Sequence, residues 1–278
     1  MDSVRIGLYE KAIPNRVPMK EKLRLARKHG YDFLEMSIDE TEDKLARLDM
    51  TNEERSRMVS DMFEEGLFIR SICLSGHRKY PLGSEDAKTR EKSLEIMRKA
   101  IILAYDLGVR IIMIAGYDEY YNESNETTRR YFLENLRKSV EMAARYGIIL
   151  AFETMETEFM NTIEKAMYYV NEVNSPYLQV YPDLGNITNA AVMYGKSVID
   201  DISLGEGNIV AFHLKETVPG VFREVPYGTG HVDFRNSLKK ILDSGINLFV
   251  CEFWDTGKTD FEEDLKFARE FVLEKMNP

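Results

Sequence analysis

The chain has 278 residues, of which 44% are hydrophobic and 30% charged, and its formal net charge at pH 7 is -10. This composition is typical of a globular protein with a large core and excludes a chain that is disordered throughout. The negative charge disfavours nucleic acid or an anionic membrane as a partner, whereas a few local cations could still hold a small anionic substrate.

Eight short apolar runs recur along the chain, with amphipathic segments between them. Such runs, rich in β-branched and aromatic residues, are typical of strands that are buried on both faces. The predicted strands are, in chain order, Val4–Tyr9, YDFLEM after Gly30, LFIRSICL after Gly66, VRIIMIAG after Gly108, IILAFET after Gly147, Leu178–Pro182, Ile209–Leu214 and INLFVCEF after Gly245.

The segments between these runs are predicted as helices, because most have apolar residues at three- and four-residue spacing. They cover Met19–His29, Asn52–Glu65, Asp86–Leu107, Asn125–Tyr146, Asn161–Val173, Asn236–Asp243 and Asp260–Lys275. The segment Asn186–Gly205 has a less regular period and an internal Gly195, and it is also predicted as a helix.

Five glycines stand between an amphipathic segment and the apolar run that follows it, at positions 30, 66, 108, 147 and 245. A helix commonly ends on a residue in the left-handed conformation, which is costly for any residue with a Cβ. Each of these glycines therefore marks a predicted turn from helix to strand.

The alternation of strands and helices predicts a parallel sheet, and eight such units close a barrel more naturally than they extend an open sheet. No low-complexity tract or linker rich in proline and serine divides the chain. We therefore expect one α/β domain over residues 1–278, a (β/α)8 TIM barrel.

The cellular compartment is predicted from the cysteines and from the start of the chain. Cys73 and Cys251 lie inside apolar runs, which indicates buried thiols without a disulfide. The opening MDSVRIGLYE lacks the features of a signal peptide, and no apolar stretch approaches the roughly 20 residues of a membrane span. We expect a cytoplasmic protein with no membrane partner.

In a TIM barrel the active site lies at the carboxyl ends of the strands, so polar residues at the ends of apolar runs are candidates. These are Glu10, Glu35, Ser75 with His77, Gly116, Glu153, Asp183, His213 and Glu252. Alone, each acid could cap a helix or be solvated, and the histidine could belong to the core. The last four, however, end four successive strands, where three carboxylates would repel one another without a cation. We predict a site for one divalent metal. Zn²⁺ and Mn²⁺ are the preferred ions, and Co²⁺ and Mg²⁺ are also compatible with these ligands.

Long motifs in the chain resemble the L-ribulose-5-phosphate 3-epimerase family of the ascorbate-utilisation branch. They include GLYEKAIP, HRKYPLGSED, AGYDEYY, YPDLGN and HLKETVPGVF. The resemblance runs over nearly the whole chain and implies a xylose-isomerase-like TIM barrel. The activity that it implies is epimerisation at C3 of a ketopentose 5-phosphate, between L-ribulose 5-phosphate and L-xylulose 5-phosphate.

The resemblance assigns the metal ligands to Glu153, Asp183, His213 and Glu252, the same four residues. A 3-epimerase must remove the C3 proton and return one to the opposite face, through a cis-enediolate. Glu153 and Glu252 are predicted to act as the general base and the general acid, while the other two only bind metal. In related ketose 3-epimerases a basic residue shortly after the ligand histidine contacts substrate hydroxyls, and Arg223 occupies that place.

Other substrate contacts are predicted more broadly. The candidate partners of the phosphate are Lys11, Arg78, Lys79 and Lys215, each of which could equally be a side chain in a surface ion pair. His77 could contact substrate or form a structural hydrogen bond, and Glu156 could bind a hydroxyl.

Three other functions stay open at this stage. An aldose-ketose isomerase on the same scaffold could use the same ligands. An apurinic endonuclease of the superfamily is disfavoured by the presence of only four histidines and by the net charge. A non-catalytic sugar-binding barrel would keep the ligands without needing the two glutamates as acid and base. Relatives are commonly dimeric, which implies a homodimer or higher homo-oligomer.

Overall fold

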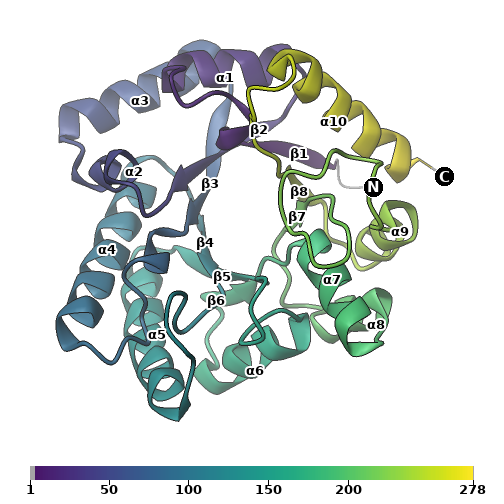
Figure 1. Cartoon of the computed structure of the whole chain (residues 1–278). Coiled ribbons are helices and arrows are strands. Elements are labelled where there is room, and N and C mark those ends of the chain that lie inside the picture. The colour runs from purple at the N-terminus through teal and green to yellow at the C-terminus, as the bar shows by residue number, and fades with distance from the viewer. Residues whose placement is uncertain (1–3, 278) are drawn as a thin grey trace.

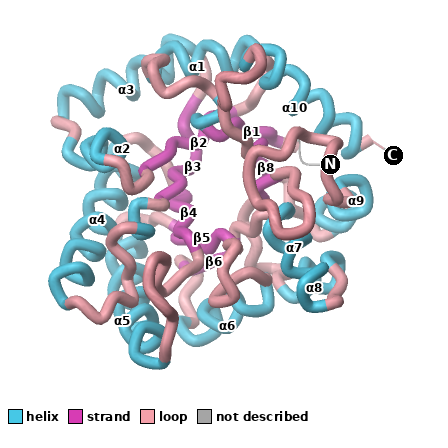
Figure 2. Tube along the Cα trace, viewed as in Figure 1, coloured by secondary structure: helices cyan, strands magenta, loops and turns pink. Residues whose placement is uncertain are grey.

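The computed structural model describes residues 4–277. Its strands form one parallel eight-stranded sheet in the order β6-β5-β4-β3-β2-β1-β8-β7, which curls into the ring seen in Figures 1 and 2. The strands are β1 (Arg5–Tyr9), β2 (Phe33–Ile38), β3 (Phe68–Leu74), β4 (Ile111–Ala115), β5 (Ile149–Glu153), β6 (Leu178–Val180), β7 (Phe212–Leu214) and β8 (Leu248–Cys251). The predicted eight-stranded α/β barrel is confirmed.

The ring closes between β6 and β7 through two isolated parallel bridges instead of a continuous ladder. One bridge joins Val180 to Ile209 and the other joins Asp183 to His213. The backbone N–H of His213 donates to the carbonyl of Pro182 at 2.9 Å. This seam therefore brings two predicted metal ligands next to each other.

Helices surround the sheet on its outer face (Figure 1). They are α1 (Met19–Lys28), α2 (Glu42–Ala46), α3 (Asn52–Glu65), α4 (Ala87–Asp106), α5 (Glu126–Arg145), α6 (Ile163–Val173), α7 (Leu184–Tyr194), α8 (Val198–Leu204), α9 (Phe234–Asp243) and α10 (Phe261–Met276). Short 3-10 turns are η1 (Glu10–Ala12), η2 (Arg47–Asp49) and η3 (Gly76–Arg78). The 3-10 turns and α2 are too short to show a helical period, and the sequence did not predict them.

The prediction of one helix over Asn186–Gly205 is wrong. The segment forms α7 and α8, which are separated at Gly195, a residue with φ of 60°. The side chain of Ser197 then caps α8 by accepting from the N–H of Asp200. By contrast, the five predicted turn glycines are confirmed, because all have φ between 62° and 82°.

A buried carboxylate at the end of β1 ties several elements together. Glu10 is fully buried and accepts from Lys22, Lys44 and Arg47, and from the backbone N–H of Ser37. These partners come from α1, α2, η2 and β2. Burial raises the pKa of Glu10, but the three cations outweigh it and lower this pKa to about 2. Glu10 is thus a structural acid that fixes the loop after β2.

The two cysteines, Cys73 and Cys251, are buried and free, in agreement with the predicted thiols. Over residues 4–277 no helix has the length and the apolar run that crossing a bilayer requires.

Candidate active site

Four of the predicted site residues converge at the carboxyl ends of β5 to β8. Glu153, Asp183, His213 and Glu252 are all buried, and each offers one ligand atom within 4.8 Å of the others. We call these four residues the acidic cluster. Asp183 also caps α7, because its Oδ1 accepts from the N–H of Asn186 at 2.7 Å. The cap leaves Oδ2 of Asp183 directed into the cluster.

Three atoms of the acidic cluster have no hydrogen-bond partner among the described residues. They are Oδ2 of Asp183, Nδ1 of His213 and Oε2 of Glu252. Nδ1 of His213 lies 3.1 Å from Oε2 of Glu252 and 3.8 Å from Oε1 of Glu153. Buried polar atoms are nearly always paired, so three unpaired acceptor-type atoms around one point fit a cation bound among them.

The other nitrogen of the His213 ring faces Glu35, a fully buried residue of β2. Nε2 of His213 lies 2.5 Å from Oε1 of Glu35. The second oxygen of Glu35 accepts from Oγ of Ser71 at 2.6 Å. Glu35 stood among the strand-end candidates of the sequence without an assigned role. Its signal was an acidic residue between two apolar ones, Leu34 and Met36, in a predicted strand.

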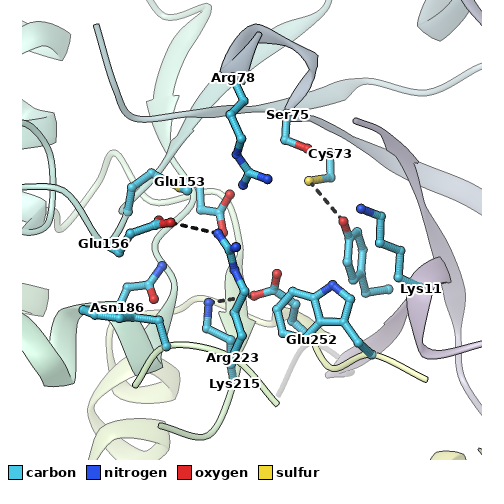
Figure 3. A pocket seen from close by; sticks show the side chains of 14 residues that line it. Lys11, Cys73, Ser75, Arg78, Glu153, Glu156, Asn186, Lys215, Arg223 and Glu252 are labelled. Carbon is cyan, nitrogen blue, oxygen red and sulfur yellow. Dashed lines mark hydrogen bonds and ion pairs between the residues drawn. The ribbon is translucent and has the colours of Figure 1, made fainter. Parts of the chain in front are cut away.

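Lys215 lies within the site, against the carboxylates. Its Nζ is 3.1 Å from Oδ2 of Asp183 and 3.3 Å from Oε2 of Glu252, and the residue is buried. Both contacts are ion pairs in a buried site. Lys215 thus pairs with two candidate ligands, of which Figure 3 shows Glu252, and its contact with phosphate stays a prediction.

The carboxylates of the cluster differ in their affinity for protons. Burial and the charge of Glu252 raise the pKa of Glu153 to about 8. Burial also raises the pKa of Asp183, to about 7, despite the charge of Lys215. For Glu252, burial is outweighed by Lys215 and His213, which hold its pKa well below the ordinary range. One buried glutamate thus favours the protonated form while its neighbour stays ionised.

A cavity of about 170 Å³ opens over the acidic cluster. Figure 3 shows its walls, which include Tyr9, Lys11, Cys73, Ser75, Arg78, Met155, Glu156, Asn186, Phe222, Arg223 and Trp254. Of the predicted substrate contacts, the cavity therefore brings together Lys11, Arg78, Glu156, Lys215 and Arg223.

Each cation at the rim of this cavity has an acidic neighbour. Nη2 of Arg223 donates to Oε1 of Glu156 at 2.8 Å, and the hydroxyl of Tyr120 donates to the same oxygen at 3.1 Å. The guanidinium of Arg78 lies over the Tyr120 ring at 4.6 Å, with Glu40 at 3.9 Å. Nζ of Lys11 lies 2.5 Å from Oδ2 of Asp39. The rim is thus cationic but already paired.

His77 and Lys79 do not line the cavity. The buried His77 ring pairs through Nε2 with the carbonyl of Ser93 in α4 at 3.2 Å, and burial lowers its pKa to about 4. Lys79 lies over the ring of Tyr80 at 5.6 Å. The structure favours the structural hydrogen bond for His77 and the surface role for Lys79, the alternatives that the sequence had left open.

The chain is similar to known proteins over almost its full length. The family described as xylose isomerase-like TIM barrel matches residues 23–271. L-ribulose-5-phosphate 3-epimerase UlaE of Escherichia coli (strain SMS-3-5) is 44% identical over 274 residues, which are 98% of this chain and 95% of that protein. The UlaE of Shigella boydii serotype 18 is 44% identical with the same coverage.

The chain belongs to the L-ribulose-5-phosphate 3-epimerase family, within the xylose isomerase-like TIM barrels. It is therefore an enzyme of the isomerase class, an epimerase.

Solved structures with the same barrel fold superpose on nearly the whole chain. A D-psicose 3-epimerase with D-tagatose from Clostridium cellulolyticum H10 has a TM-score of 0.82 at 15% identity, covering 99% of this chain and 100% of that chain. The IOLI protein with a zinc atom has a TM-score of 0.78 at 18% identity, covering 98% of each chain. At these identities the likeness concerns the barrel alone.

Proposed function

We propose that this epimerase is a divalent-metal-dependent enzyme that interconverts L-ribulose 5-phosphate and L-xylulose 5-phosphate. The observation that carries the proposal is the acidic cluster, in which oxygens of Glu153 and Glu252 both lie within 4.0 Å of Nδ1 of His213, at 3.8 Å and 3.1 Å. The 44% identity to UlaE proteins over 98% of the chain supports the choice of substrate.

The metal would be held by Glu153, Asp183, His213 and Glu252. The unpaired buried atoms of the last three support this assignment. Three oxygen donors and one nitrogen suit Zn²⁺ or Mn²⁺, and also admit Co²⁺ or Mg²⁺. A bound divalent ion would polarise the C2 carbonyl of the ketose and so acidify the proton on C3.

Glu153 and Glu252 would move the proton. They come from the ends of β5 and β8, which β6 and β7 separate around the ring, so they can face one carbon from two sides. The ionised glutamate takes the C3 proton, and the electrons of the C–H bond shift to form the enediolate of the sugar. The protonated glutamate then donates its proton to the opposite face of C3, and their roles exchange in the reverse direction.

The residues at the rim would orient the sugar phosphate. Arg223 and Glu156 form a donor and acceptor pair suited to hydroxyl groups. Arg78 and Lys11, which point into the cavity from different sides (Figure 3), supply positive charge, and a phosphate could replace their acidic neighbours.

The test is an assay of metal-stripped protein reconstituted with single metals and offered phosphorylated and unphosphorylated ketopentoses. We expect activity only with a divalent metal, higher kcat/KM for the phosphorylated sugars, and deuterium from solvent at C3 alone. Glu153→Gln and Glu252→Gln should each lose about 10²- to 10⁴-fold in kcat. Glu119→Gln, which changes a buried glutamate outside the cavity, is the matched control. Deuterium at C1 would instead support an aldose-ketose isomerase.

A further inference from the structure

The ring of His213 presents two different nitrogens to two different environments. Nδ1 faces the acidic cluster, and Nε2 faces Glu35 at 2.5 Å. A neutral imidazole carries its proton on one nitrogen only, and the partner of that nitrogen decides which one remains free to bind a metal. A carboxylate can only accept, so Glu35 favours the proton on Nε2. Nδ1 is then left with its lone pair toward the cluster.

Glu35 is itself held in place by the sheet. A register shift between Leu34 and Glu35 puts Glu35 opposite Ser71 of β3. The hydroxyl of Ser71 donates to Oε2 at 2.6 Å, which leaves Oε1 for the His213 ring. The carboxylate is fully buried and cannot turn to solvent instead.

The ring of His213 is also confined from its sides. Tyr181 meets it edge to face at a centroid distance of 5.1 Å, and Tyr9 lies at 6.0 Å. His213 comes from β7 and Glu35 from β2, strands that do not neighbour each other in the sheet. Their contact therefore crosses the interior of the barrel and is not a by-product of strand pairing.

We propose that Glu35 is a positioning residue of the metal site: it selects the tautomer of His213 with the proton on Nε2 and aims Nδ1 at the metal. The inference rests on the proposed metal site, to which it adds a fifth side chain that touches neither metal nor substrate. Glu35 thus contributes to metal affinity through His213.

A purely structural role for Glu35 makes a different prediction. A structural residue would change the unfolding temperature of the metal-free protein but not the affinity of the folded protein for metal. A positioning residue changes the affinity, because a His213 ring without its partner can turn or carry its proton on Nδ1. The two roles are therefore separated by measuring both quantities on the same variants.

The experiment is calorimetric titration of the metal-stripped protein with Co²⁺, together with thermal unfolding in a chelator. Glu35→Ala should weaken Co²⁺ binding by about 10- to 100-fold. Glu35→Gln keeps the volume and an accepting oxygen, so it should fold and show a smaller loss. Ser71→Ala, which frees Oε2 of Glu35, should show a loss in the same direction. The visible spectrum of bound Co²⁺ should change in the variants, since it reports on the histidine ligand.

Glu119→Gln serves again as the buried control and should bind Co²⁺ like the wild type. If Glu35→Gln and Glu35→Ala bind Co²⁺ within twofold of the wild type, the role of Glu35 is refuted while the metal site stands. If the wild type itself binds no divalent metal, the proposed function falls as well, so the two failures are distinguishable.

Discussion

Two buried acidic regions at the mouth of the barrel resemble each other in burial and differ in their cations. Glu10 is a single carboxylate met by Lys22, Lys44 and Arg47. The acidic cluster holds three carboxylates, with Lys215 as the one lysine or arginine side chain in ion-pair range among the described residues. The charge of Glu10 is balanced by cationic side chains of the protein, whereas the three carboxylates of the cluster have too few cations to balance theirs. This difference separates an acid that stabilises the fold from acids that suit a metal.

The same difference appears in the pKa values. Burial disfavours the charged form of Glu10 and Glu153 alike. The three cations reverse that effect for Glu10, whose pKa falls to about 2, whereas burial and the charge of Glu252 outweigh His213 and Lys215 at Glu153, whose pKa rises to about 8. Burial alone therefore does not tell which buried acid is functional.

The largest expected effect is on stability, from Glu10→Gln. This change leaves three buried or half-buried cations without their counter-charge, which typically costs about 3–5 kcal/mol. Urea unfolding followed by circular dichroism should show this loss equally in the presence and absence of metal. Glu119→Gln is the control, and a loss below about 1 kcal/mol for Glu10→Gln would mean that the cations find other partners.

The next effect is the stabilisation of the protein by metal. At a metal concentration roughly 100 times the Kd, binding to the folded state should add about 2.7 kcal/mol. Glu10→Gln should keep this increment, because its site is separate from the cluster. Asp183→Asn should lose most of it, although asparagine still caps α7. An equal increment in Asp183→Asn and the wild type would contradict the ligand assignment.

The last effect is on the pH dependence of folding stability, compared between Glu153→Gln and the wild type without metal. The pKa of Glu153 is raised from 4.5 to about 8, so the folded state holds this proton more tightly than the unfolded state. Stability must therefore fall as the pH rises from 4.5 through 8. Glutamine has no proton to lose, so in a chelator the stability of the variant relative to the wild type should increase as the pH rises from 5 to 9. Parallel pH profiles for the two proteins would contradict this interpretation.

The fold was predictable because its signals are local. Glycines such as Gly66 and Gly147 end helices in the left-handed conformation, and the runs that follow them form strands. The four residues of the cluster were predictable for a related reason, since each stands at the end of its strand. The sequence did not predict the helix break at Gly195, because the apolar pattern of Asn186–Gly205 was interpreted as one continuous helix.

The partners of the cluster were less predictable. Glu35 reaches His213 across the barrel interior, over 178 positions in the chain, and no local pattern records that contact. Lys215 follows the histidine by two positions, so it could be assigned to the site but not to its carboxylate partners. His77 stands in a conspicuous motif, yet its ring turns toward α4. Side-chain direction at the mouth depends on packing that sequence periodicity does not describe.

The incomplete seam between β6 and β7 makes the closure of the barrel depend on few backbone contacts. Asp183 and His213 are the residues of one of its two bridges, and both are candidate ligands. An ion bound by both would cross-link the two edges of the sheet at the place where backbone pairing is sparsest. Amide hydrogens of β6 and β7 should then exchange more slowly when metal is bound. The ion that activates the substrate would also stabilise the closure of the barrel.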